Sequence, residues 1–306
     1  MTDSEIKTIL FITLSYVGDA IMSTPVLEAL HQRYPQATID IVGDRRSTLL
    51  FSQCPYLGKI YHKDKQQFLR GSVALLQQVR HTTYDLIVDI RTDGLSWLMK
   101  GRHRMTKLRA RPYGKHAVEE FMGVIHRLHG DRPIPPTRVW YGEREKDYAR
   151  QALSELDTTR LLLVAPGAGT KPEVKCWGTD NFAAFCNALS NHFTAVALIG
   201  VKFEQDLTTA ITHQLHLPYT DLAGDNNLLE VAALCERACF FVGNDSGLGH
   251  LAAATGTPVL TLFGSHSPKR VRPWGKNTLH LTSQNRRASS ILVSDAVALV
   301  TNSGLV

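Results

Sequence analysis

Short apolar runs that alternate with helical stretches constrain the fold of this chain more than any other feature of its sequence. The first run, residues 8–14, is rich in β-branched and other apolar side chains, as is typical of a strand buried on both faces. A glycine-containing turn at 15–19 and a helical stretch at 25–34 follow it. The same order then recurs, which predicts parallel strands joined by right-handed helical crossovers.

The alternation occurs in two series, and a proline-rich segment separates them. Residues 131–137 contain three prolines, which cannot continue a helix or a central strand, so this segment is the best linker candidate. We predict two Rossmann-like, doubly wound α/β domains at 1–150 and 151–288, with a last helix in 289–306. Two such domains facing a central cleft suit an enzyme that joins two substrates, because ligands bind at the carboxyl ends of the strands. The other expected elements are strands at 37–42, 59–62, 84–90, 161–165, 195–199, 239–242 and 259–263, and helices at 68–80, 143–156, 180–192, 203–215, 228–236, 248–254 and 290–300.

The composition excludes several classes of protein. With 43% hydrophobic and 20% charged residues, the 306-residue chain resembles a globular enzyme and not a disordered segment. No apolar run approaches the roughly 18–20 residues that cross a bilayer, and Asp3 and Glu5 stand where a signal peptide carries basic residues. The five cysteines form no CxxC pair, so neither a disulfide framework nor a metal site is expected. The predicted location is the cytoplasm.

The net charge of +6 is concentrated in the first half of the chain. Residues 1–150 hold 23 Lys and Arg against 16 Asp and Glu, whereas residues 151–306 hold 11 against 12. Residues 94–118 contain no acid, and their basic residues form either a solvated face or a surface for an anionic partner. A phosphorylated substrate or an acidic membrane face ranks above nucleic acid, because the chain has no RNP motif or zinc finger.

The first candidate site is Gly18-Asp19, directly after the first expected strand. One interpretation is that Asp19 only caps a helix. The other is that its carboxylate faces the cleft and takes a proton from a hydroxyl nucleophile, with Gly18 allowing a tight turn.

Three further candidates follow strands in the second half. Residues 242–251 (VGNDSGLGHL) combine a glycine-rich turn with a helix start, whose backbone N–H groups bind phosphate; a helix capped by Asp245 or Ser246 is the alternative. Residues 166–177 (PGAGTKPEVKCW) offer glycines, a hydroxyl and two lysines, which suit a diphosphate. They do not form a Walker A loop, and the chain has no GxGxxG. Glu204 either accepts from a ribose hydroxyl or is a surface acid in a first helical turn.

Together these segments resemble glycosyltransferase family 9, the ADP-heptose:lipopolysaccharide heptosyltransferases. The opening ILFITLSYVGDAIMSTPVLEALHQRYPQATIDIV is similar to the strand–GD–helix start of that family. The stretch FVGNDSGLGHLAAATGTPVLTLFGSHSP resembles its donor-site signature. The order of the motifs, with GAGTKPEVKCW between them, also matches, so the resemblance spans nearly the whole chain.

The resemblance implies a GT-B fold, with the acceptor on the first domain and the nucleotide sugar on the second. It also implies that the last helix crosses back to pack on the first domain, and that the anomeric centre is inverted without a metal or other cofactor. Asp19 matches the general base of the family, and Lys175 matches the lysine that contacts donor phosphate. The donor-binding residues implied or suggested by their loops are Thr170, Lys171, Glu204, Asp245, Ser246, Gly247, Leu248 and His250.

For the substrates, the resemblance implies ADP-heptose as donor and the lipopolysaccharide inner core as acceptor. That acceptor carries carboxylate and phosphate groups and is assembled on the cytoplasmic face of the inner membrane, so we expect peripheral association there and no nucleic-acid partner. The expected acceptor contacts are Gly18, Arg45, Arg46, Arg102 and Arg104. The alternatives are another nucleotide sugar, a protein or capsule acceptor, or a nucleotide-sugar-binding protein without turnover.

Overall fold

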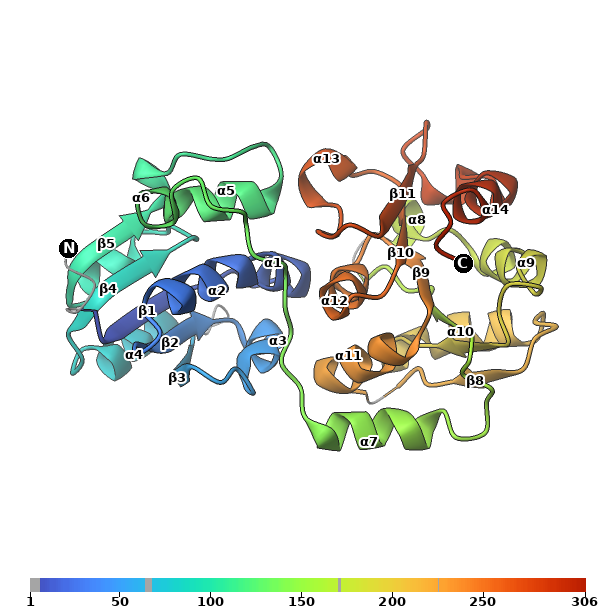
Figure 1. Cartoon of the computed structure of the whole chain (residues 1–306), viewed down its shortest axis with the longest axis horizontal. Helices are drawn as coiled ribbons and strands as arrows, with labels where there is room; N and C mark the ends of the chain where they lie inside the picture. The colour runs from blue at the N-terminus through green and yellow to red at the C-terminus, as the bar shows by residue number, and fades with distance from the viewer. Residues whose placement is uncertain (1–5, 64–67, 170–171, 225) are drawn as a thin grey trace. The chain divides into compact units, whose positions relative to one another are not determined.

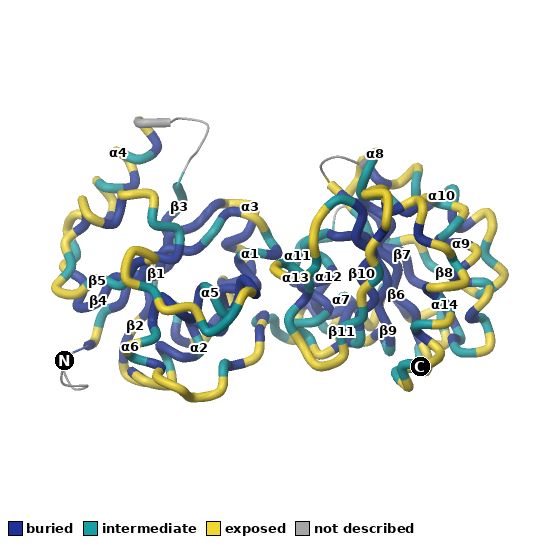
Figure 2. The backbone as a smooth tube through the Cα atoms, turned by 90° about the horizontal axis from the view of Figure 1, so that it is seen from above, coloured by how far each residue is buried: buried dark blue, intermediate teal, exposed yellow. Residues whose placement is uncertain are grey.

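The computed structural model describes residues 6–63, 68–169, 172–224 and 226–306, and it divides into two compact units, Met1–Trp140 and Tyr141–Val306 (Figure 1). Each unit has its own parallel sheet with helices packed on it. In each sheet the central strands are buried, whereas the exposed backbone lies in the surrounding loops and helix faces (Figure 2). The predicted α/β fold with parallel strands is confirmed.

The sheet of the first unit has the strand order β3-β2-β1-β4-β5, and all of its strand pairs are parallel. Strands β1 and β4 lie side by side in the middle, with Ile9 opposite Leu86, and their side chains form the core as the continuous apolar runs predict. The strands are β1 (Thr8–Ile12), β2 (Thr38–Gly43), β3 (Leu57–His62), β4 (Tyr84–Asp89) and β5 (Gly101–Thr106). The helices are α1 (Val17–Met22), α2 (Thr24–Arg33), α3 (Arg45–Thr48), α4 (Phe68–Val79), α5 (Ala117–Val124) and α6 (His126–His129), with short 3-10 turns η2 (Leu49–Phe51), η3 (Leu95–Leu98) and η4 (Lys107–Arg109).

The sheet of the second unit has the order β11-β10-β9-β6-β7-β8, again with parallel pairs. The chain order reverses direction across the sheet between β6 and β9, which is the switch point where ligands bind in such folds. The strands are β6 (Leu161–Ala165), β7 (Ala195–Leu198), β8 (Tyr219–Asp221), β9 (Phe240–Asn244), β10 (Val259–Phe263) and β11 (Thr278–Thr282). The helices are α7 (Glu143–Ala152), α8 (Pro172–Lys175), α9 (Thr179–Ala188), α10 (Gln205–Thr212), α11 (Leu228–Arg237), α12 (Gly247–Thr255), α13 (Pro268–Val271) and α14 (Val293–Thr301), with η5 (Lys202–Glu204) and η6 (Ala288–Ser290).

One boundary differs from the sequence prediction. The division between the units falls after Trp140 and not after residue 150, because α7 packs against α11 of the second unit. Within its own unit the last helix, α14, lies on α9 and β11, where Ala296 and Val300 join the core of the second unit, because its small and apolar side chains fill that face. That α14 also packs on the first domain stays a prediction.

Among the described residues, no helix combines the length and the hydrophobicity that crossing a membrane requires.

Candidate active site

In the first unit, Gly18 and Asp19 lie in the first turn of α1, at the carboxyl end of β1. The N-cap position belongs to Tyr16, so Asp19 is inside the helix and is not its cap. Gly18 is buried and Asp19 is half-buried. A carboxylate in a first helical turn lies near the positive end of the helix dipole.

The two arginines predicted after β2 differ in their surroundings. Asp44 caps α3 by accepting from the backbone N–H of Arg46, and the Arg46 guanidinium returns to the same carboxylate with bonds of 2.9 and 2.8 Å. This hydrogen bond raises the pKa of Arg46, and the guanidinium also lies 5.6 Å from the centre of the Tyr16 ring, next to α1. Arg45 is exposed at the same edge of the sheet. Arg45 is therefore the better placed of the two to meet an anion from solution.

The loop after β4 has a strained backbone that a buried carboxylate holds in place. Asp89 is fully buried, and its Oδ1 accepts from the backbone N–H groups of Arg91 and Thr92 at 3.0 and 2.7 Å. Thr92 adopts a φ of +57°, which is unfavourable for a β-branched residue. Such strain persists only where the surrounding contacts impose it, and it is concentrated at functional sites.

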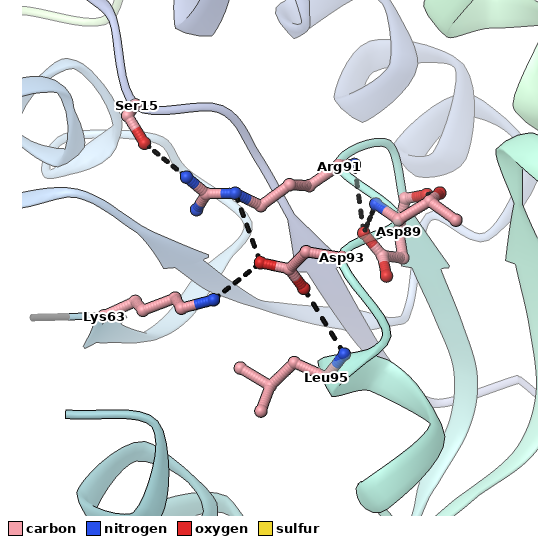
Figure 3. A network of polar contacts seen from close by, with 7 residues as sticks. Ser15, Lys63, Asp89, Arg91, Asp93 and Leu95 are labelled. Atoms are coloured by element: carbon pink, nitrogen blue, oxygen red, sulfur yellow. Dashed lines mark hydrogen bonds and ion pairs between the residues drawn. The ribbon is translucent and has the colours of Figure 1, made fainter. Parts of the chain in front are cut away.

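The side chains of the same loop connect three strands (Figure 3). Arg91 donates from Nη2 to the Ser15 hydroxyl at 2.6 Å, and its Nε lies 3.4 Å from Asp93 Oδ2. Lys63, which follows β3, donates to the same oxygen of Asp93 at 2.6 Å. Burial raises the pKa of Asp93, but Lys63, the Leu95 N–H group and the Arg91 charge together outweigh it and keep the pKa below its usual value. Because Ser15 precedes α1, this network ties the start of the Asp19 helix to β3 and β4.

The other two predicted arginines are not brought together with Asp19. Arg102 pairs with Asp85 at 3.0 Å, and Asp85 accepts from the backbone N–H groups of Lys7 and Thr8, at the amino end of β1. Arg104 donates to the carbonyls of Ser96, Met99 and Gly101 and lies over the Trp97 ring. These bonds give both arginines structural roles, one at the opposite edge of the sheet and one within the β4–β5 connection.

In the second unit, the predicted phosphate turn lies between β9 and α12. Ser246 is the N-cap residue, and it makes no side-chain capping bond among the described residues. Its hydroxyl is buried and has no hydrogen-bond partner in the part of the chain that the structure describes. Gly247 and Leu248 form the first turn, and His250 is buried within α12. The predicted alternative, a helix capped by Asp245 or Ser246, is therefore not the observed arrangement.

Asp245 instead contacts two nitrogen-bearing side chains, Lys175 and His266, from neighbouring loops. Its Oδ2 lies 3.3 Å from the Lys175 ammonium at the end of α8. His266, which follows β10, lies 2.7 Å from the same oxygen through Nδ1. Lys175 also donates to the Asp245 carbonyl at 3.4 Å. The loops after β6, β9 and β10 thus meet at one carboxylate.

A buried asparagine fixes the spacing of two of these loops. Asn244, the last residue of β9, accepts from the Trp177 backbone N–H at 3.1 Å and donates to the Pro166 carbonyl at 2.6 Å. Trp177 is itself fully buried and donates from its indole to the Ile291 carbonyl at 2.8 Å. Lys175 therefore stands on a short helix whose exit is anchored in the core.

Glu204 lies against the glycine-rich loop that follows β6. Its Oε2 accepts from the Val201 backbone N–H at 3.1 Å, and a Cβ on Gly167 would come within 1.9 Å of its Oε1. Burial, and then the Glu204 charge, raise the pKa of Cys176, which comes from the same loop. Glu204 is thus a buried carboxylate beside the donor loop and not the surface acid of the alternative interpretation.

Two of the predicted donor residues, Thr170 and Lys171, lie outside the described residues. Among the described residues, no three His, Cys, Asp or Glu side chains gather in the way that binds a metal ion.

Two groups of residues at the sites were not predicted from the sequence. One is His266, and the other is the network of Ser15, Lys63, Arg91 and Asp93. Each follows or precedes an element at the carboxyl edge of its sheet, which was the available signal.

The parallel sheets, with glycine-rich and cationic loops at their carboxyl ends, are those of a GT-B α/β protein. The chain belongs to glycosyltransferase family 9: the family model described as "Glycosyltransferase family 9 (heptosyltransferase)" matches residues 93–296. The protein is accordingly a glycosyltransferase.

Relatives of known name or structure cover most of the chain. It is 27% identical over 303 residues to lipopolysaccharide heptosyltransferase 3 of Escherichia coli K12, covering 89% of this chain and 87% of the relative. A family 9 glycosyltransferase of Veillonella parvula has a similar structure, with a TM-score of 0.84, 19% identity and coverage of 97% and 96%. The Escherichia coli ADP-heptose lipopolysaccharide heptosyltransferase II gives a TM-score of 0.78, with 22% identity and coverage of 96% and 98%.

Proposed function

We propose that this protein transfers heptose from ADP-heptose to an anionic lipopolysaccharide inner-core acceptor, inverts the anomeric centre and needs no bound metal. Heptosyl transfer is supported by the family and by the printed names of the relatives, and ADP-heptose by the name of one of them. The observation that carries the donor site is the start of α12, where the N-cap residue Ser246 makes no side-chain capping bond among the described residues and the Lys175 ammonium lies beside it.

The donor half of the proposal concerns a departing diphosphate. The N–H groups at the start of α12 and the positive end of its dipole favour an anion, and Lys175 adds a full positive charge. As the bond to the sugar breaks, negative charge develops on the diphosphate, and these fixed donors stabilise it without reorganising. Glu204, beside the Gly167 loop, is the proposed partner of a ribose hydroxyl.

The acceptor half concerns one proton. Asp19 removes the proton from the acceptor hydroxyl as that oxygen attacks the anomeric carbon from the face opposite the nucleotide. A diphosphate leaves without protonation, so a second catalytic carboxylate of the glycosidase kind is not needed. Arg45 is the proposed contact for a carboxylate or phosphate of the acceptor, since it is exposed at the same edge of the sheet as Asp19.

We also propose that the first unit associates peripherally with the cytoplasmic face of the inner membrane. Residues 94–118 carry no acid, and Trp97, Leu98 and Leu108 in this segment are 56%, 70% and 74% exposed. Apolar side chains next to basic ones bind the surface of an anionic bilayer. Sedimentation with vesicles containing phosphatidylglycerol should carry the protein down, and replacing the three apolar residues by serine should leave it in the supernatant. Equal sedimentation of both proteins would contradict the proposal.

The test of the donor and base assignments compares binding with turnover. Calorimetry with ADP, UDP, GDP and their sugars should give micromolar binding for ADP and ADP-heptose only. Asp19→Asn should keep that binding and lose transfer, whereas Lys175→Met should lower the rate by about 10²–10³. NMR of the product should show the inverted anomer.

The controls match each residue to one of the same kind outside the site. Asp295 occupies the same position in the first turn of α14 as Asp19 does in α1, so Asp295→Asn should leave transfer unchanged. Lys276→Met removes an exposed lysine and should do the same. Tighter binding of UDP or GDP compounds would indicate another nucleotide sugar. Binding by wild type without transfer to any lipopolysaccharide, protein or capsule acceptor would indicate a non-catalytic binding protein.

A further inference from the structure

His266 contacts the proposed donor residue Asp245, but the proposed function gives His266 no role. It follows β10, and its Nδ1 lies 2.7 Å from Asp245 Oδ2, the shortest contact that this carboxylate makes among the described residues. The Asp245 side chain is only 12% exposed, whereas the His266 side chain is 53% exposed. An ionised carboxylate only accepts hydrogen bonds, so Nδ1 of His266 carries the proton.

The position of Asp245 makes this bond consequential. A side-chain oxygen at a helix N-cap normally accepts from the free N–H groups of the first turn. Asp245 stands one residue before the N-cap Ser246, next to the same N–H groups. Here its Oδ2 is held by His266 and Lys175, and the N-cap residue Ser246 makes no capping bond among the described residues. Asp245 therefore bonds to residues of neighbouring loops, and the described residues show no bond from its carboxylate or from the Ser246 hydroxyl to the first N–H groups of α12.

We propose that His266 is a positioning residue, which holds the Asp245 carboxylate away from the α12 amides so that a diphosphate can bind them. The inference rests on the proposed function, because the ligand that benefits is the donor diphosphate. Without His266, Asp245 has two sets of donors left, the Lys175 ammonium and the amides at the start of α12. Lys175 already pairs with Asp245 in the presence of His266, so the change expected on losing His266 is a turn of the carboxylate toward the amides, which the phosphates require.

The side-chain geometry supplies a selective test. In asparagine the amide nitrogen is separated from the backbone by the same number of bonds as Nδ1 of histidine, so His266→Asn keeps a donor to Asp245. In glutamine the nitrogen stands one bond further out, and His266→Gln places it away from that oxygen. His266→Ala removes the donor. His213, an exposed histidine that follows α10, gives the matched control His213→Asn.

The measurements are the Kd of ADP by calorimetry and the KM and kcat for ADP-heptose with the full-length protein. We expect His266→Ala and His266→Gln to weaken ADP binding by about tenfold, which is the scale of a lost hydrogen bond to a charged group. Both should raise KM to a similar extent, with kcat changed less than about threefold. His266→Asn should restore Kd to within about threefold of wild type, and His213→Asn should equal wild type.

Three results would overturn the role of His266. They are unchanged ADP binding in His266→Ala, an Asn variant as weak as the Ala variant, and a Gln variant that recovers as fully as Asn. The comparison of Asn with Gln remains decisive even where the Ala variant is poorly folded. Absence of ADP binding in the wild-type protein is a separate outcome, and it would contradict the proposed donor site itself.

Discussion

Gly167 shows how closely two segments approach at the proposed donor site. A Cβ at this position would lie 1.9 Å from Glu204 Oε1, which is far too close for two heavy atoms that are not bonded to each other. Gly167→Ala therefore forces the Glu204 carboxylate to move, and its bond to the Val201 backbone is lost with it. We expect unfolding to require about 1–3 kcal/mol less free energy, because overpacking of a buried site costs that much. Urea denaturation measures the change.

Glu204→Ala is the second variant, and it tests whether the Glu204 carboxylate is the group that Gly167→Ala displaces. In that background the space beside Gly167 is open, so adding Gly167→Ala should cost clearly less than it does alone, as expected for two residues in contact. Equal costs in the two backgrounds would show that the carboxylate is not what the alanine displaces.

The loop after β4 is the element that connects α1 to the strands. Arg91 contributes its bonds to Ser15 and Asp93, and Thr92 keeps its positive φ within the same loop (Figure 3). Arg91→Met should lower the free energy of unfolding by about 1–3 kcal/mol, since it removes the hydrogen bond to the buried Ser15 hydroxyl and one of the partners of Asp93. It should also lower kcat for transfer more than it weakens ADP binding, because the loop supports the Asp19 helix. Denaturation and steady-state kinetics measure both, and Arg109→Met, at an exposed arginine in η4, should change neither.

Asp85 joins the amino ends of β1 and β4 through its hydrogen bonds, and the stability that these bonds contribute depends on pH. Burial raises the pKa of Asp85, but the N–H groups of Lys7 and Thr8 outweigh it and hold the pKa below its usual value. A carboxyl with a lowered folded-state pKa stabilises the fold above its unfolded pKa of about 3.9, and the contribution is lost as pH falls toward the folded value. Asp85→Asn should therefore cost about 1–3 kcal/mol at neutral pH.

Urea denaturation at pH 7 and at pH 3 tests this sign. The difference between wild type and Asp85→Asn should shrink at the lower pH, and a difference that grows would show that the pKa is raised instead. Arg102 is mostly exposed, so Arg102→Met should cost less than about 1 kcal/mol.

The individual strands show how far the fold could be predicted from the sequence. Strands β1, β4, β6, β9 and β10 have continuous apolar runs, and all were expected close to where they lie. The edge strands β5, β8 and β11 were not expected, because GRHRMT, YTD and TLHLT are polar or short. Their strand pairing comes from the neighbouring strand, which no local pattern reports.

For the candidate site, the loops were predictable but the partnerships were not. Residues after buried strands could be identified because a parallel sheet gathers those loops at one edge. The bond between His266 and Asp245 depends on β10 lying next to β9, and that of Arg91 with Ser15 depends on β4 lying next to β1. Arg102 and Arg104 were chosen for charge alone. Charge reveals neither that Arg102 pairs with Asp85 nor that the Arg104 guanidinium is directed at backbone carbonyls.

For the molecule as a whole, we propose that the second unit binds the donor and that the first unit supplies Asp19. Separating the two units tests this assignment. The proposed donor residues that the structure describes, including Lys175, Glu204 and Asp245, all belong to Tyr141–Val306. A fragment of residues 141–306 should bind ADP within a few-fold of the full chain and catalyse no transfer, since Asp19 is absent. Calorimetry and an activity assay give the answer.

A fragment starting at residue 153 is the informative comparison, because it lacks α7, which packs against α11. It should unfold at a lower temperature than the fragment starting at 141. Equal stability of the two would favour the boundary near residue 150 that the sequence predicts.

The start of α12 also has a consequence for the rate of the reaction, because a product nucleotide can bind where the donor binds. In the proposed donor site, backbone amides and a lysine would recognise phosphates, whichever group the outer phosphate carries. If the donor is ADP-heptose, as proposed, the released ADP presents the same two phosphates and should compete for the site after every turnover. We therefore expect the rate to follow the ratio of donor to spent nucleotide, so that the reaction slows when ADP accumulates.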